Sequence, residues 1–86
     1  MTEPQATRYF IDQVLRKRPY LTIGMCMAVV QNPLSIKHQS DERIRHWGLV
    51  TLPNEPQARI LRVITLEDGV TIHNAFPDRN FREDAP

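Results

Sequence analysis

Histidines and arginines in or beside apolar, β-forming segments are the side chains that could carry chemistry in this chain. Six of them form the candidate set: Arg45, His46, Arg59, Arg62, His73 and Arg79. Cleavage of an RNA phosphodiester needs a base, an acid and cations that stabilise the charge developing on the phosphate. We therefore predict that His73 acts as acid or base, that Arg62 and Arg79 hold phosphate, and that the other three residues bind RNA.

A structural role for the same residues stays open. Histidines are often half exposed on a sheet, and arginine stems cover apolar surface while their charged ends reach water. None of the six follows a recognised catalytic spacing. The run Arg16-Lys17-Arg18 also has two interpretations: it contacts phosphates, or it stabilises the negative C-terminal end of a helix.

Other kinds of site are not indicated. His38, His46 and His73 lack the spacing of metal ligands, and no cofactor is expected. Cys26 has a methionine on each side and no local base, which favours a buried hydrophobic role over a nucleophilic one. The glycines are scattered and form no phosphate-binding loop.

A β-hairpin over residues 59–76 must position the candidate residues. Asp68-Gly69 predicts a two-residue type I′ turn, which would pair Ile64 with His73 and Arg62 with Ala75. Because side chains alternate along a strand, Arg62 and His73 would then share an open face. The predicted core face carries Leu61, Val63, Thr65, Val70, Ile72, Asn74 and Phe76.

Two helices are predicted before the sheet. Apolar residues at i and i+4 spacing predict a first helix over residues 7–17, with Thr7 as a possible cap and Pro19 as its end. Thr22 is the expected N-cap of a second helix over residues 23–31. A strand remains an alternative for this second segment because it contains two adjacent valines.

Further strands are predicted over residues 34–39 and 43–52. A register that pairs Val50 with Ala58 would set His46 opposite Arg62 and place Trp47 and Leu49 under the helices. The fold class is therefore α+β, with two N-terminal helices packed on one face of a three- to four-stranded antiparallel sheet.

Composition indicates a single small domain over residues 1–86, with flexible ends at 1–6 and 83–86. Hydrophobic residues make up 41 % and charged residues 24 % of the chain, as in ordinary globular proteins. The net charge of +1 does not by itself indicate a nucleic-acid partner. A single cysteine, no signal peptide and no membrane-length apolar run favour a cytoplasmic protein with no membrane partner.

The order of motifs resembles a widespread group of small, uncharacterised prokaryotic proteins. The segments that carry the resemblance are RPYL, VVQNP, RIRHWGLV and ARILRVITLEDGVTIHNAFPDRNF. By its element order, the group is similar to the RelE/BrnT-type toxins. This resemblance implies an RNA-binding toxin or endoribonuclease that acts on RNA or the ribosome and has an antitoxin partner. The residues nearest to those that such toxins use are Arg62, His73, Asp78 and Arg79.

Two functional hypotheses follow. The first is a RelE-like, toxin-type RNA-binding protein or endoribonuclease. The second is a small, non-catalytic binding module that docks a protein partner, or a second copy in a homodimer, through the open face or an edge strand.

Overall fold

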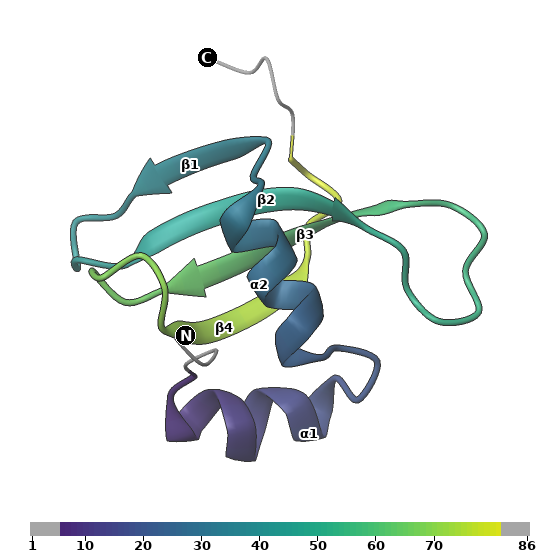
Figure 1. Ribbon diagram of the computed structural model, residues 1–86, viewed down its shortest axis with the longest axis horizontal. Coiled ribbons are helices and arrows are strands. Elements are labelled where there is room, and N and C mark those ends of the chain that lie inside the picture. The colour runs from purple at the N-terminus through teal and green to yellow at the C-terminus, as the bar shows by residue number, and fades with distance from the viewer. Residues whose placement is uncertain (1–5, 82–86) are drawn as a thin grey trace.

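The computed structural model describes residues 6–81 and shows two helices packed against a four-stranded antiparallel sheet (Figure 1). The predicted α+β class is therefore confirmed. The expected flexible ends lie outside the described residues, apart from Ala6. That residue forms an isolated parallel bridge with Ile72, so the chain is already held by the sheet at this point.

The four strands follow one another in chain order. They are β1 (Ser35–His38), β2 (Ile44–Val50), β3 (Arg59–Thr65) and β4 (Ile72–Pro77). Every neighbouring pair is antiparallel, which leaves β1 and β4 at the edges. The loop between β2 and β3 projects beyond the rest of the sheet (Figure 1).

The first helix is π-helical in its middle. It runs through η1 (Phe10–Val14) into α1 (Leu15–Lys17), and the N–H of Leu15 donates to the carbonyl of Phe10, five residues back. The hydroxyl of Thr7 accepts the N–H of Phe10 at 3.1 Å, which confirms its predicted capping role. Phe10 and Val14 are both buried against the sheet.

The second helix, α2 (Ile23–Gln31), has the predicted bounds and the predicted cap. The Thr22 hydroxyl accepts the N–H of Met25 at 3.0 Å. The helix buries Cys26 and Val29, and it crosses the sheet over β2 and β3 (Figure 1). Gly48 lies beneath it in β2, and a Cβ atom there would stand 3.1 Å from a methyl carbon of Val29. The helix and the sheet therefore approach each other closely at this glycine.

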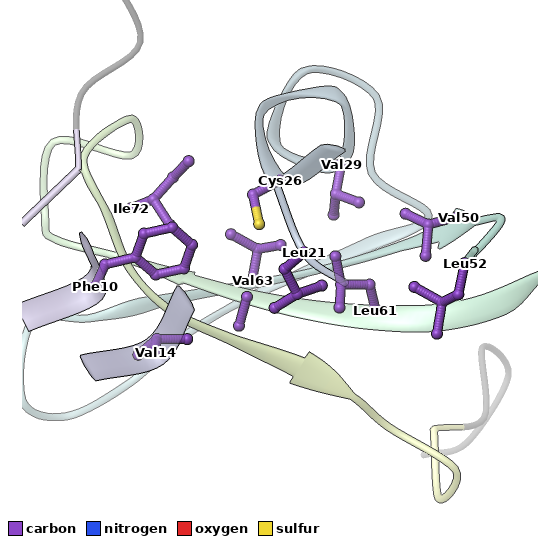
Figure 2. Packing of buried hydrophobic residues seen from close by; sticks show 11 residues of the cluster. Phe10, Val14, Leu21, Cys26, Val29, Val50, Leu52, Leu61, Val63 and Ile72 are labelled. Carbon is purple, nitrogen blue, oxygen red and sulfur yellow. The ribbon is translucent and has the colours of Figure 1, made fainter. Parts of the chain in front are cut away.

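The hydrophobic core lies between the helices and one face of the sheet (Figure 2). Phe10, Cys26, Leu61, Val63 and Ile72 are fully buried there. Burial of one such large apolar side chain contributes roughly 1.5–3 kcal/mol. Leu61, Val63 and Ile72 were predicted as core from strand alternation, and the structure confirms them.

The register between β2 and β3 differs from the predicted one. Val50 pairs with Arg59, not with Ala58, so His46 lies opposite Val63 and Trp47 lies opposite Arg62. A shift of one residue exchanges the two faces of a strand. The predictions for His46 and Trp47 were therefore wrong. His46 faces the helices, whereas Trp47 lies on the face that no helix covers, which we call the open face.

The β3–β4 hairpin is also shifted from the predicted pairing. Arg62 pairs with Phe76, and a β-bulge interrupts the ladder at Ile64-Thr65. At the turn end the predicted register holds, since Thr65 pairs with Ile72 and the N–H of Leu66 donates to the carbonyl of Thr71. The bulge therefore moves β4 by one residue relative to Arg62.

This shift changes which residues of β4 reach the core. Ala75 is fully buried on the helix side, whereas Phe76 lies beside Arg62 on the open face. The prediction of Phe76 as a core residue was therefore wrong. Asn74, opposite Ile64, is also on the open face, and Val70 is exposed. No helix of residues 6–81 has the length and apolar character needed to cross a membrane.

Candidate functional site

A cleft of about 590 Å³ opens beside β3, the end of β4 and the segment between α1 and α2. We call it the arginine cleft, after Arg18, Arg59, Arg62 and Arg79, which line it. The other lining residues are Tyr20, Phe76, Pro77, Asp78 and Asn80. Four guanidinium groups against one carboxylate make the lining strongly cationic, although the whole chain is close to neutral.

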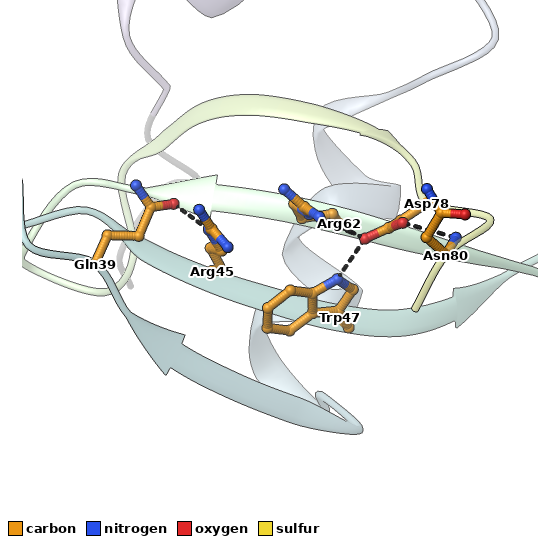
Figure 3. A network of polar contacts seen from close by, with 6 residues as sticks. All are labelled: Gln39, Arg45, Trp47, Arg62, Asp78 and Asn80. Carbon is orange, nitrogen blue, oxygen red and sulfur yellow. Dashed lines mark hydrogen bonds and ion pairs between the residues drawn. The ribbon is translucent and has the colours of Figure 1, made fainter. Parts of the chain in front are cut away.

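Asp78 is the centre of a hydrogen-bond network at one side of the cleft (Figure 3). Its Oδ2 atom accepts from Trp47 Nε1 at 2.9 Å, from Arg62 Nε at 3.1 Å and from Arg62 Nη2 at 2.7 Å. Burial alone would raise the pKa of Asp78, but the hydrogen bonds from Trp47 and Arg62 lower it below its usual value. The carboxylate is therefore ionised at neutral pH and holds both partners in place.

Aromatic rings flank the guanidinium group of Arg62. Its Cζ atom lies 4.9 Å from the ring centre of Phe76 and 5.4 Å from that of Trp47. These are distances at which a cation is attracted to the face of an aromatic ring. The ring of Phe81 stacks on Trp47, with 5.2 Å between the ring centres and 23° between the planes. Arg62 is thus oriented by a carboxylate and by two rings.

The other arginines of the cleft differ in how far they are neutralised. Arg59 forms an ion pair with Glu55 at 2.8 Å, and both side chains are partly exposed. Arg18 lies over Phe76, with its Cζ atom 5.9 Å from the ring centre. Within residues 6–81, neither Arg18 nor Arg79 is paired with a carboxylate. Their charges are available to an anionic ligand.

The structure brings together three of the six predicted site residues, Arg59, Arg62 and Arg79. It adds Arg18 and Tyr20, which sequence reasoning did not place there. The basic run at residues 16–18 was a signal for Arg18. Nothing in the local sequence indicates Tyr20, because the turn after α1 reaches the cleft only through tertiary packing.

His73 lies apart from these arginines. It stands five residues before Asp78, which is about 16 Å along an extended strand. Its Nδ1 atom is 3.1 Å from the hydroxyl of Thr7, and its ring packs against Tyr9 with 5.1 Å between ring centres. Burial, with a smaller effect of the Arg43 charge, lowers the pKa of His73. Its contacts are therefore with the N-terminal segment.

His46 and Arg45 are also outside the cleft. His46 is only 3 % exposed, its Nδ1 atom lies 3.3 Å from the carbonyl of Val63, and burial lowers its pKa. The ring is therefore a neutral part of the interior. Arg45 donates to the side chain of Gln39, at the end of the open face away from Asp78 (Figure 3).

Metal and thiol chemistry find no support in the described part of the chain. Within residues 6–81, no group of three or more His, Cys, Asp or Glu side chains could hold a metal ion. Cys26 is buried, and burial raises the pKa of its thiol to about 12. The thiol is therefore protonated at neutral pH and unreactive.

Comparison with known proteins adds no relative to these observations. No family model, curated protein or solved structure matches this chain. The geometry of the arginine cleft is therefore the basis for assigning a function.

Proposed function

We propose that the protein is a RelE-like, toxin-type RNA-binding protein that holds the phosphates of single-stranded RNA in the arginine cleft. The observation that carries the proposal is the gathering around one cleft of Arg18, of Arg59 and Arg62 from β3, and of Arg79. Arginine suits phosphate because its planar group can donate two parallel hydrogen bonds.

The aromatic residues in the cleft favour RNA over other anions. Tyr20 and Phe76 lie among the arginines. Proteins that bind single strands combine a cationic groove with aromatic side chains on which unpaired bases stack. The resemblance of the element order to RelE/BrnT-type toxins points to the same class of ligand.

The geometry supports binding more directly than cleavage. The cleft is lined by arginines and aromatic residues, and Asp78 is committed to Trp47 and Arg62. The candidate acid or base, His73, contacts Thr7 and Tyr9 instead. We therefore propose that the arginine cleft is a binding site and does not itself cleave the strand.

Replacement of Arg79 tests this function. Arg79→Ala should weaken the binding of a short single-stranded RNA about fivefold to tenfold, because one phosphate contact is lost. The slope of log affinity against log salt should also become shallower by about 0.7. Fluorescence anisotropy of a labelled oligonucleotide, titrated at several salt concentrations, measures both quantities.

Arg8→Ala is the matched control for Arg79→Ala. The Arg8 side chain is 92 % exposed on the first helix and does not line the cleft. Its loss should leave affinity within twofold of the wild type. Equal losses in the two variants would show that binding follows overall charge and not the cleft. If the wild type cleaved RNA and His73→Ala abolished that cleavage, the protein would be an endoribonuclease and the binding function proposed here would be wrong.

A second candidate function, the docking of a protein partner, is favoured by an apolar surface at β1. Leu34, just before the strand, and Ile36, within it, are 39 % and 52 % exposed. Strand β1 has a sheet neighbour on one side only among residues 6–81. An edge strand with apolar side chains readily pairs with a strand of another chain.

Light scattering coupled to size-exclusion chromatography tests this second function. If β1 pairs with a second copy, the protein should elute with twice its chain mass of 10.0 kDa. Ile36→Lys should return it to a monomer, because a charge on the edge opposes pairing. Ile11→Lys is the control, since Ile11 is similarly exposed (49 %) but lies on the first helix. A monomeric wild type at high concentration would exclude the homodimer.

A further inference from the structure

We propose that the indole ring of Trp47 is a nucleobase-stacking platform beside the arginine cleft, and that Phe81 covers this platform in the free protein. The inference rests on the proposed function and specifies its ligand as a single strand with unpaired bases. It also gives Phe81 a role, namely to occupy the place of a base until a strand binds.

The position and rigidity of Trp47 suit a platform. The residue lies on the open face of the sheet, opposite Arg62, where no helix covers it. Its Nε1–H donates to Asp78 Oδ2 at 2.9 Å, which fixes the plane of the ring. Trp47 is nevertheless only 6 % exposed, and the ring of Phe81 is stacked on it.

The platform and the cleft are joined through one atom. Asp78 Oδ2 accepts from the indole of Trp47 and from the guanidinium of Arg62, which lines the cleft. The Arg62 Cζ atom lies 5.4 Å from the Trp47 ring centre. A strand whose phosphates contact the cleft arginines therefore has a neighbouring base close to the indole.

Phe81 is placed so that a base can replace it without disturbing the network. It follows the turn in which Asp78 Oδ1 accepts the N–H of Asn80 at 3.0 Å, and its side chain is half-buried. Rotation of Phe81 away from Trp47 breaks none of the three hydrogen bonds to Asp78 Oδ2. A purine has a larger flat face than a phenyl ring, so the exchange restores the stacking on Trp47.

Fluorescence gives a direct test because Trp47 is the only tryptophan of the chain. Single-stranded hexa-adenylate RNA should quench the Trp47 emission of the full-length protein. Phe81→Ala should bind this oligomer about fivefold more tightly, because no side chain has to leave the indole. An abasic oligomer with the same number of phosphates should bind through the arginines without quenching and with equal affinity for both proteins.

The outcomes separate this inference from the proposed function. Suppose that both oligomers bind and that Arg79→Ala weakens this binding, but that Trp47 emission is unchanged and Phe81→Ala has the wild-type affinity. The stacking platform is then excluded, and the proposed RNA-binding function stands. Weaker binding by Phe81→Ala also excludes it, since Phe81 would then contact the strand. If neither oligomer binds, both proposals are wrong. Should Phe81→Ala fail to fold, Phe81→Leu, which also removes the ring, is expected to bind at least twofold more tightly.

Discussion

Replacing Asp78 with alanine should lower the free energy of unfolding by about 3 kcal/mol. The Asp78 side chain is only 7 % exposed, and one of its oxygens accepts three hydrogen bonds. Its removal leaves the indole N–H of Trp47 and the guanidinium of Arg62, whose side chain is 23 % exposed, without their acceptor. Unsatisfied buried donors, and above all a charged one, account for the size of the effect.

Urea denaturation followed by circular dichroism measures this loss. Asp12→Ala is the matched control, because Asp12 pairs with Arg8 on the helix surface and its side chain is 54 % exposed. Such exposed pairs contribute less than about 0.5 kcal/mol. If the two variants were equally stable, Asp78 would not hold the open face together.

The contribution of Asp78 should also depend on pH. Its pKa is lowered in the folded protein, so the ionised form stabilises the fold above the unfolded pKa of about 3.9. That contribution is lost as pH falls through the lower pKa of the folded state. The stability difference between wild type and Asp78→Ala should therefore be constant near neutrality and decrease in acid below about pH 4. A constant difference down to pH 2 would contradict the ion pair.

Replacing Gly48 with alanine should destabilise the protein by about 1–3 kcal/mol. A Cβ atom at this position would stand 3.1 Å and 3.2 Å from the two methyl carbons of Val29. Val29 belongs to the tightly packed core, so its side chain has little room to give way to the extra atom. The midpoint of urea denaturation gives the size of the loss.

Gly24→Ala is the control, because it makes the same glycine-to-alanine change at a position without a close neighbour. Gly24 is exposed on α2, and the atom nearest to its added Cβ is the Thr22 hydroxyl at 3.9 Å. Alanine is the better helix former, so this variant should be more stable by about 0.5–1 kcal/mol. Combining Gly48→Ala with Val29→Ala should cost less than the sum of the two single changes. Additive losses would show that the two residues do not compete for space.

The helices were predictable because their signals are local. Thr7 and Thr22 each cap a helix, and each hydroxyl accepts the backbone N–H of the residue three positions later in the chain. Polar capping side chains, apolar spacing and proline act within a few residues of one another. The bounds of α2 follow from such short-range features.

The faces of the sheet were not predictable in the same way. They depend on the length of the loop over residues 51–58 and on the bulge at Ile64-Thr65, and an error of one residue in either exchanges the faces. Trp47 and Phe76 were assigned to the core for this reason, although both lie on the open face.

The candidate site could be predicted only in part. Its arginines are visible as residue types, but the ion pair of Arg62 with Asp78 joins a residue of β3 to the residue that follows β4. Only the correct register brings them together. Arg18 and Tyr20 reach the cleft because the turn after α1 packs beside β4, and that arrangement has no short-range signature.

The bridge between Ala6 and Ile72 has a consequence for how copies of this chain could assemble. The N–H of Thr7 donates to the carbonyl of Ile72 at 2.9 Å, so the N-terminal segment covers the β4 edge at the start of the strand. Among residues 6–81, no such bridge lies along β1, so the outer backbone groups of this strand face outward for another sheet to pair with. If two copies paired through β1, the same strand of each copy would be used, and this contact would close as a two-fold pair.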